Sequence, residues 1–201
     1  HRSTGCSRRY RNHEAERYYK TFCSGNTVKN RCVRRTKRPE KLVSLSFFYQ
    51  EEIVMRIAAL DIGGTSIKSG IWNGQDMVGV KEHATNAKNG GRYVMERAVE
   101  ILRQYDDFEA IGISTAGQVN SAEGCIRYAN ENIPGYTGMK VREIMEREFH
   151  VPAAVENDVN AAAIGEGQFG AGRAFKDFLC ITYGTGVGGA IVMNKQIYTG
   201  N

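Results

Sequence analysis

Apolar and polar residues alternate differently in two parts of this chain. Residues 1–54 show neither the 3.6-residue period of an amphipathic helix nor the two-residue period of a strand, apart from the run LVSLSFF near their end. From Met55 onward, short apolar runs alternate with turns rich in glycine, which supplies 21 of these 147 residues. We therefore expect residues 1–54 to be a leader without a fold of its own, and Met55, the first methionine, to be the natural start.

The apolar runs after Met55 predict a defined order of secondary structure. In chain order, the expected elements are strands over 56–62, 67–72 and 77–84, a helix over 91–105, a strand over 108–115, an extended segment over 125–130, a helix over 139–149, a strand over 152–157 and a helix over 159–167. The first helix carries one apolar stripe at helical spacing, formed by Val94, Ala98, Ile101, Leu102 and Tyr105. Three strands followed by alternating helices and strands predict an α/β fold with a mixed sheet, the ribonuclease H-like lobe of actin-type ATPases.

Two further apolar runs, residues 177–184 and 188–198, predict the opening strands of a second lobe. The first lobe then spans residues 55–175, and the start of the second spans 176–201. Because two strands cannot bury a core by themselves, we expect the second lobe to be truncated. Exposed apolar faces and unpaired strand edges favour instability or association, and we expect this chain to be inactive alone.

Charge is distributed unevenly along the sequence. The net charge of +5 arises in the leader, where residues 1–50 hold 13 Lys and Arg against 3 Asp and Glu, whereas the remainder holds 14 against 19. The leader cluster Arg34, Arg35, Lys37 and Arg38 leaves open a nucleic-acid-binding arm, but the helical periods of a helix-turn-helix are missing, so nucleic acid is not the expected partner. The sequence contains no apolar stretch of about 20 residues and no secretory pattern, which predicts a cytoplasmic protein without a membrane partner.

The segment LDIGGTSIKSG (60–70) joins two expected strands and carries the first candidate chemistry. Gly63 and Gly64 let backbone N–H groups approach an anion closely, and Thr65 adds a hydroxyl group. Asp61, at the end of a strand, can hold Mg²⁺ through water. These groups suit the phosphates of a magnesium–nucleotide complex. The alternative is a simple hairpin turn with glycine at positive φ.

A second glycine-rich turn, YGTGVGGA (183–190), again lies between two apolar runs. Thr185 and the N–H groups of Gly184 and Gly186 would contact the other side of a triphosphate. The alternative is a flexible linker. Two such loops, one from each expected lobe, are what a hinged phosphate clamp requires.

In the segment VENDVNAAA (155–163), Asp158 lies at the junction of an expected strand and an expected helix. A carboxylate there can accept the proton of a substrate hydroxyl group as its oxygen attacks the γ-phosphorus of a nucleotide, while Asn157 hydrogen-bonds a neighbouring hydroxyl. Asn and Asp are also the usual N-caps of helices. Both roles can hold together, because capping would fix the carboxylate in place.

In this order and spacing, the three segments resemble the ROK family of sugar kinases and regulators over essentially all of residues 55–201. The resemblance implies an ATP-dependent, glucokinase-like enzyme that converts a hexose or N-acetylhexosamine to its 6-phosphate, with Asp158 as the catalytic base. It assigns the ATP phosphates to the residues Asp61, Gly63, Gly64, Thr65, Lys68, Gly184, Thr185, Gly186 and Gly188. The alternative is a sugar-sensing transcriptional regulator or another non-catalytic sugar-binding protein, which would need neither the phosphate loops nor Asp158.

The segments ISTAGQVN (113–120) and YANENIPGY (128–136) resemble the sugar-contacting segments of the family. The candidate sugar-binding residues are therefore Gly117, Asn130, Asn132, Asn157 and Asp158. Ordinary turn chemistry is the alternative for this region. The family's zinc-ligating residues would follow residue 201, so we expect no zinc site in this chain and Zn²⁺ only in a full-length parent, which we expect to be a homo-oligomer.

Overall fold

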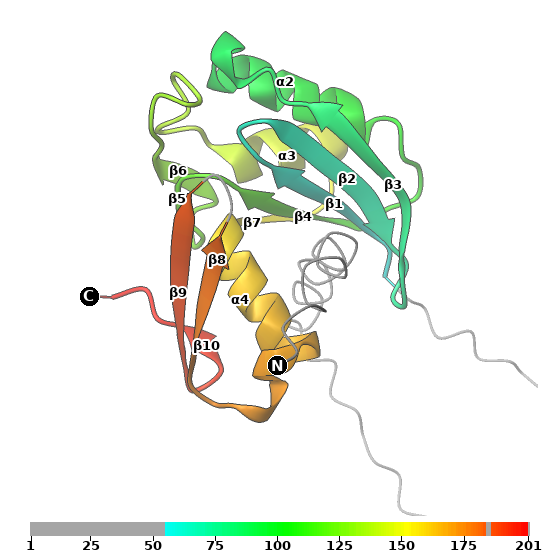
Figure 1. The fold of residues 1–201 in the computed structure, drawn as a ribbon. Coiled ribbons are helices and arrows are strands. Elements are labelled where there is room, and N and C mark those ends of the chain that lie inside the picture. The colour runs from blue at the N-terminus through cyan, green and yellow to red at the C-terminus, as the bar shows by residue number, and fades with distance from the viewer. Residues whose placement is uncertain (1–54, 184–185, 201) are drawn as a thin grey trace, which may run out of the picture.

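The computed structural model of this protein describes residues 55–183 and 186–200 (Figure 1). Its centre is a five-stranded sheet in the order β3-β2-β1-β4-β7. The strands are β1 (Ile57–Ile62), β2 (Ser66–Trp72), β3 (Met77–Ala84), β4 (Ala110–Thr115) and β7 (Ala153–Asn157). β1, β2 and β3 form an antiparallel meander, whereas β4 and β7 run parallel to β1. The predicted mixed sheet is confirmed; the predicted leader over residues 1–54 lies outside the described residues.

The alternation of side chains along β1 creates two different faces of this sheet. Ala58, Leu60 and Ile62 are fully buried in the main core, which lies under α2 (Gly91–Leu102) and α3 (Val141–Phe149). Figure 1 shows both helices on the same side of the sheet. The predicted stripe of α2 is buried as expected, except that the helix ends at Leu102 and Tyr105 follows it.

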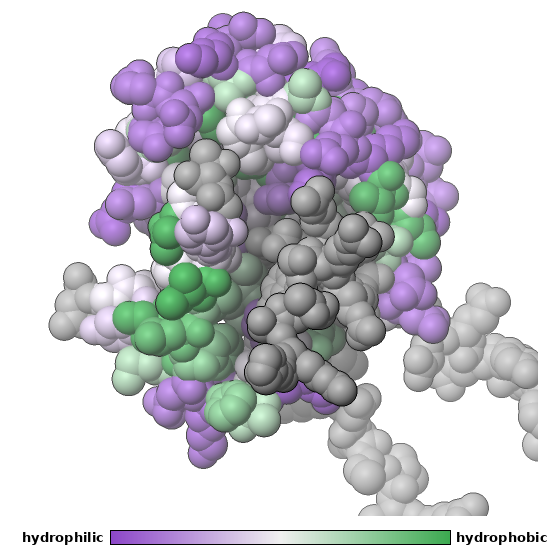
Figure 2. All heavy atoms as spheres, viewed as in Figure 1, coloured by the Kyte–Doolittle hydropathy of each residue, from purple (hydrophilic) through white to green (hydrophobic). Residues whose placement is uncertain are grey.

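The opposite side of the sheet is where α4 (Asp158–Phe169) and a second sheet lie (Figure 1). This second sheet contains β8 (Phe178–Tyr183), β9 (Val187–Met193) and β10 (Gln196–Ile197) in the order β10-β9-β8. Its inner face packs on α4 through Ala190 and Val192. Its outer face exposes Leu179 and Ile181, with 69% and 70% of their surface accessible, and Figure 2 shows apolar side chains gathered there.

The apolar run over residues 188–198 contains β9 and the short strand β10, which was not expected. Asn194 and Lys195 adopt φ values of 51° and 66° and reverse the chain between these two strands. A further pair, β5 (Gln118–Asn120) and β6 (Cys125–Tyr128), forms an antiparallel hairpin. Only β6 was expected from the sequence.

Short 3₁₀ turns complete the described fold, η1 (Ala87–Asn89) before α2 and η2 (Ala171–Ala174) after α4. Across residues 55–183 and 186–200, none of the helices is long and apolar enough to cross a membrane.

Candidate active site

The carboxyl ends of three parallel strands meet at one edge of the central sheet. The register places Asp61 of β1 beside Ser114 of β4, and Ser114 beside Glu156 of β7. One residue further along, Thr115 of β4 pairs with Asn157 of β7. In open α/β sheets, ligands bind in the crevice outside the carboxyl ends of the strands. This edge therefore gathers the candidate residues that the sequence places far apart.

The turn between β1 and β2 is held in shape by its own backbone. The N–H of Gly63 donates to the carbonyl oxygen of Ser66 at 3.0 Å, and the hydroxyl of Thr85 donates to the carbonyl oxygen of Gly63 at 2.7 Å. The N–H of Gly63 is thus used to close the turn. Gly64 and Thr65 are exposed, and a Cβ on Gly64 would meet no atom within 4 Å.

Neither Gly63 nor Gly64 has a positive φ, so their backbone conformation does not require glycine. The hairpin-turn alternative, which depended on glycine at positive φ, therefore does not explain these two residues. A Cβ on Gly63 would lie 3.1 Å from the carbonyl oxygen of Ser66, whereas the missing side chain of Gly64 leaves open space over the turn, as a closely approaching anion needs.

Asp61 lies at the end of β1 with its carboxylate oriented by a neighbouring strand. The hydroxyl of Ser114, which is almost fully buried, donates to Asp61 Oδ1 at 2.9 Å. Lys68 of β2 is the antiparallel partner of Asp61, so the two side chains emerge on the same face of the sheet. The predicted phosphate-loop residues Asp61 and Lys68 are therefore neighbours in space.

Asp158 begins α4, and Asn157 is the residue that caps this helix. The side chain of Asn157 accepts hydrogen bonds from the N–H groups of Val159 at 3.0 Å and Asn160 at 3.2 Å. Asp158 Oδ1 accepts from Asn157 Nδ2 at 2.7 Å and from the N–H of Val159 at 2.9 Å. Because Asn157 performs the capping, the capping alternative does not account for Asp158, whose carboxylate is fixed in place by Asn157.

The environment of Asp158 makes its carboxylate a stronger base than a free aspartate. Partial burial raises its pKa above the usual value, and the hydrogen bonds from Val159 and Asn157 oppose this effect without cancelling it. A carboxylate with a raised pKa accepts a proton more readily than one in water.

Gly117 follows β4 and brings the candidate sugar segment to Asn157. The amide of Asn157 donates to the carbonyl oxygen of Gly117 at 2.8 Å. Gly117 has a φ of +101°, and a Cβ there would lie 2.9 Å from the carbonyl oxygen of Tyr128. Both the backbone conformation and the close approach of Tyr128 require glycine at this position.

A cavity of about 300 Å³ lies between the first turn and the sugar segments. Its lining includes four of the predicted site residues: Gly64, Gly117, Asn130 and Asn132. Both asparagines are exposed, and Asn130 Oδ1 accepts a hydrogen bond from the N–H of Asn132 at 3.0 Å, which shapes the turn. Asp158 does not line this cavity, but it is joined through the Asn157 amide to Gly117 in the cavity wall.

The second glycine-rich loop is described only in part. Gly184 and Thr185 lie outside the described residues, and Gly186 is exposed with no atom within 4 Å of an added Cβ. Gly188 is different, because a Cβ there would lie 2.5 Å from Val159 Cγ2 and 2.8 Å from Thr182 Oγ1. Close packing of β9 against α4 is therefore sufficient reason for glycine at position 188.

Three residues that contribute to this region were not singled out in the sequence. Ser114 orients Asp61. The hydroxyl of Tyr136 hydrogen-bonds that of Thr115 at 3.0 Å and anchors the segment carrying Asn130 and Asn132, and burial raises the pKa of Tyr136 to about 12. Glu156 accepts hydrogen bonds from three groups. The one signal in the sequence was the charged Glu156 within an apolar strand.

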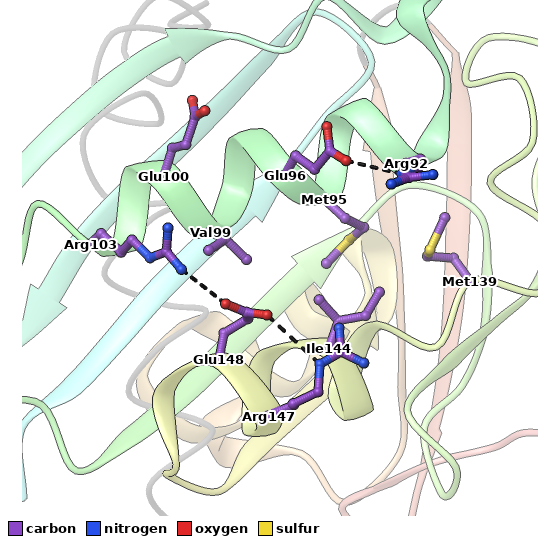
Figure 3. A pocket seen from close by; sticks show the side chains of 10 residues that line it. All are labelled: Arg92, Met95, Glu96, Val99, Glu100, Arg103, Met139, Ile144, Arg147 and Glu148. Atoms are coloured by element: carbon purple, nitrogen blue, oxygen red, sulfur yellow. Dashed lines mark hydrogen bonds and ion pairs between the residues drawn. The ribbon is translucent and has the colours of Figure 1, made fainter.

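A larger cavity, of about 500 Å³, lies between α2 and α3 and contains none of the candidate residues. Figure 3 shows its apolar floor and charged rim, formed by Met95, Val99, Ile144, Arg103, Arg147 and Glu148. Glu148 pairs with Arg103 at 2.9 Å and with Arg147 at 3.7 Å. The charges of the rim are thus paired with one another, and we assign this groove to the packing of the two helices.

Within residues 55–183 and 186–200, no group of three or more His, Cys, Asp or Glu side chains is placed to hold a metal ion directly. The carboxylate of Asp61 still fits Mg²⁺, because Mg²⁺ keeps several waters and is held by one or two carboxylates together with substrate phosphates.

Comparison with known proteins connects this arrangement to a family. Residues 57–201 match the ROK family. An uncharacterised protein of Clostridium perfringens is 42% identical over 147 residues, which are 71% of this chain and 50% of that protein. A β-glucoside kinase of Listeria monocytogenes is 34% identical over 146 residues, which are 73% of this chain and 49% of the kinase.

A solved structure also superposes on this fold. It is a ROK family glucokinase from Streptomyces griseus in complex with glucose and AMPPNP, with a TM-score of 0.65 and 30% identity over 73% of this chain and 47% of that chain. The present chain spans about half the length of the curated relatives it matches.

Proposed function

The chain belongs to the ROK family, and we propose on this basis that it supplies the nucleotide-binding lobe, and much of the sugar site, of an ATP-dependent sugar kinase. The substrate class is a hexose or an N-acetylhexosamine, as its kinase relatives suggest. The relatives include a β-glucoside kinase, and the glucokinase of known structure binds glucose and an ATP analogue.

The main support for this proposal is that the side-chain amide of Asn157 links Asp158 to the cavity wall. Asn157 Nδ2 donates to both the Gly117 carbonyl oxygen and Asp158 Oδ1, at 2.8 and 2.7 Å. The same cavity is lined by Gly64 of the first turn. A sugar in this cavity would therefore lie between a candidate phosphate loop and a candidate base, which is the arrangement that phosphoryl transfer needs.

The proposed chemistry uses Asp158 as a proton acceptor. The hydroxyl oxygen of the sugar forms a bond to the γ-phosphorus of ATP, the bond between that phosphorus and the bridging oxygen of ADP breaks, and the hydroxyl proton passes to Asp158. Its raised pKa favours this transfer. Asn157 holds the carboxylate still, and Asn130 and Asn132 offer amides that both donate to and accept from sugar hydroxyl groups.

We assign the nucleotide phosphates to the two glycine-rich loops. Gly64 and Thr65 present the exposed part of the first loop, and Lys68 brings a positive charge to the same face as Asp61. The second loop contributes Gly184, Thr185 and Gly186. Mg²⁺, held by Asp61 through water, would neutralise charge on the phosphates. Ser114 keeps the Asp61 carboxylate oriented for this role.

The test is sugar-dependent release of ADP by the intact protein, measured over a panel of glucose, N-acetylmannosamine and β-glucosides. Asp158→Ala is expected to abolish phosphorylation while leaving ATP affinity nearly unchanged, because Asp158 contacts the hydroxyl and not the nucleotide. Asp106→Ala, which lies outside the candidate site, is the matched control.

Retained turnover in Asp158→Ala would contradict the assignment of the base. Sugar binding by calorimetry without any ADP release from the wild-type protein would instead favour a non-catalytic sugar sensor.

A further inference from the structure

Glu156 lies inside the candidate site, yet the proposed chemistry gives it no task. It follows Val155 on β7 and is the register partner of Ser114. Both of its carboxylate oxygens are occupied. Oε2 accepts a hydrogen bond from the hydroxyl of Ser121 at 2.6 Å, and Oε1 accepts from the N–H of Asn157 at 2.7 Å and from Asn160 Nδ2 at 3.1 Å.

These contacts join two separate elements of the fold. Ser121 lies in the turn between β5 and β6, whereas Asn160 lies in the first turn of α4. Hydrogen bonds to a charged carboxylate are stronger than those between neutral groups. A single carboxylate therefore ties the β5–β6 hairpin to the start of the helix that carries Asp158.

Strand β5 is consequently held at both of its ends by neighbouring residues of β7. Before β5, the carbonyl oxygen of Gly117 accepts from Asn157 Nδ2 at 2.8 Å, and after β5, Ser121 donates to Glu156. The turn is also held from α3, where Arg142 donates to the carbonyl oxygens of Ser121 at 2.6 Å and Ala122 at 2.9 Å. With both ends fixed, β5 cannot shift along β7 without breaking one of these bonds.

The position of this hairpin determines the shape of the cavity. Gly117 and Gln118 at its start and Tyr128 at its end all line the cavity of about 300 Å³. A displacement of the hairpin would therefore move this wall relative to Asp158. Misplacement of a substrate by about 1 Å can lower a reaction rate by about a hundredfold.

We propose that Glu156 is a positioning residue, which fixes the hairpin wall of the sugar cavity at a set distance from Asp158. This inference rests on the proposed function, since it concerns the placement of the same sugar. Glu156 does not touch the reacting atoms. It acts through Ser121 on one side and through the first turn of α4 on the other.

Ser121→Ala in the intact protein is the sharpest perturbation, because it removes one hydroxyl from a turn and leaves the carboxylate and its α4 contacts in place. The kcat/KM for the sugar is expected to fall about tenfold, as for the loss of a hydrogen bond to a charged group. The KM for ATP is expected to stay unchanged. Glu123→Gln is the matched control, because Glu123 belongs to the same turn and its side chain accepts a hydrogen bond from Cys125, within the hairpin.

Variants of Glu156 itself separate a hydrogen-bonding role from a charge role. Glu156→Ala is expected to lower kcat/KM at least as much as Ser121→Ala. Glu156→Gln is expected to recover most of the activity, because its amide oxygen can accept from Asn157 and Asn160 while its NH₂ donates to Ser121. The double variant Ser121→Ala/Glu156→Ala should be no worse than Glu156→Ala alone, as for two residues that act through one contact.

Amide hydrogen exchange gives a readout that needs no catalysis. Glu156→Ala is expected to speed exchange in both segments 117–121 and 157–160, Ser121→Ala only in 117–121, because the α4 contacts of Glu156 stay in place, and Glu123→Gln in neither. Unchanged exchange over 117–121 in Ser121→Ala, or an unchanged kcat/KM for the sugar in an active protein, would overturn the positioning role. A wild-type protein without sugar-dependent ADP release refutes the kinase proposal instead, and the exchange experiment still decides whether Glu156 couples the two segments.

Discussion

Replacing Gly117 with alanine tests whether the cavity wall depends on a backbone that glycine alone adopts without strain. Its φ is +101°, and the new Cβ would lie 2.9 Å from the carbonyl oxygen of Tyr128. Backbone strain of this kind costs about 1–3 kcal/mol. A contact this short, against backbone that must move, adds about 1–3 kcal/mol. We therefore expect Gly117→Ala to lower the free energy of unfolding by roughly 2–6 kcal/mol.

Gly135→Ala is the matched control for the backbone effect alone. Gly135 also has a positive φ, of +66°, but a Cβ there would meet nothing within 4 Å. Gly135→Ala should therefore lower the free energy of unfolding by only about 1–2 kcal/mol, which is the cost of placing alanine in the left-handed conformation. Urea denaturation of both variants and the wild-type protein, compared at equal m-values, isolates the cost of the contact with Tyr128.

The two variants should also differ in sugar binding. Since Gly117 and the segment after Tyr128 line the cavity, Gly117→Ala should weaken sugar binding in calorimetry, whereas Gly135→Ala, outside that lining, should not. If Gly117→Ala destabilises the protein no more than Gly135→Ala and binds sugar normally, the close approach of Tyr128 does not require glycine at position 117.

Two further variants test packing and ionisation in the same region. Gly188→Ala should lower the free energy of unfolding by about 1–3 kcal/mol, because its Cβ would collide with Val159 on α4. Gly186→Ala is its control, because a Cβ at that position would meet no atom within 4 Å. Equal thermal midpoints for the two variants would contradict the packing role of Gly188. Burial raises the pKa of Asp158 in the folded protein above its value of about 3.9 in the unfolded chain. The stability that the Asp158 side chain contributes is therefore fully present below about pH 3.9 and is lost as the pH rises through the pKa of the folded state. Asp158→Asn should therefore be more stable than the wild-type protein near neutral pH. In denaturation experiments across a range of pH, this difference in the free energy of unfolding should vanish below about pH 4. A difference of the same size at every pH would contradict the predicted ionisation of Asp158.

Hydrophobic periodicity alone was enough to predict most of the central lobe. The strand expected over residues 77–84 has the same bounds in the structure, and the apolar stripe of α2 is the one that is buried. Along the 12 residues of α2, buried positions recur at helical spacing, whereas most positions of β3 are exposed and show no alternating burial. The strands β5 and β10, of three and two residues, have no such repeat, and they form only because β6 and β9 offer partners.

The amino-acid pattern alone therefore predicted which groups are available for chemistry: a glycine-rich turn after Asp61, asparagines after β6, and a carboxylate at a strand–helix junction. It did not determine which of them meet. The tertiary structure decided that Asn157 reaches Gly117, 40 residues earlier, and that Glu156 reaches Ser121, 35 residues earlier. The physical reason is that such contacts follow from the register of β4 against β7, and periodicity within one strand carries no information about its alignment with another.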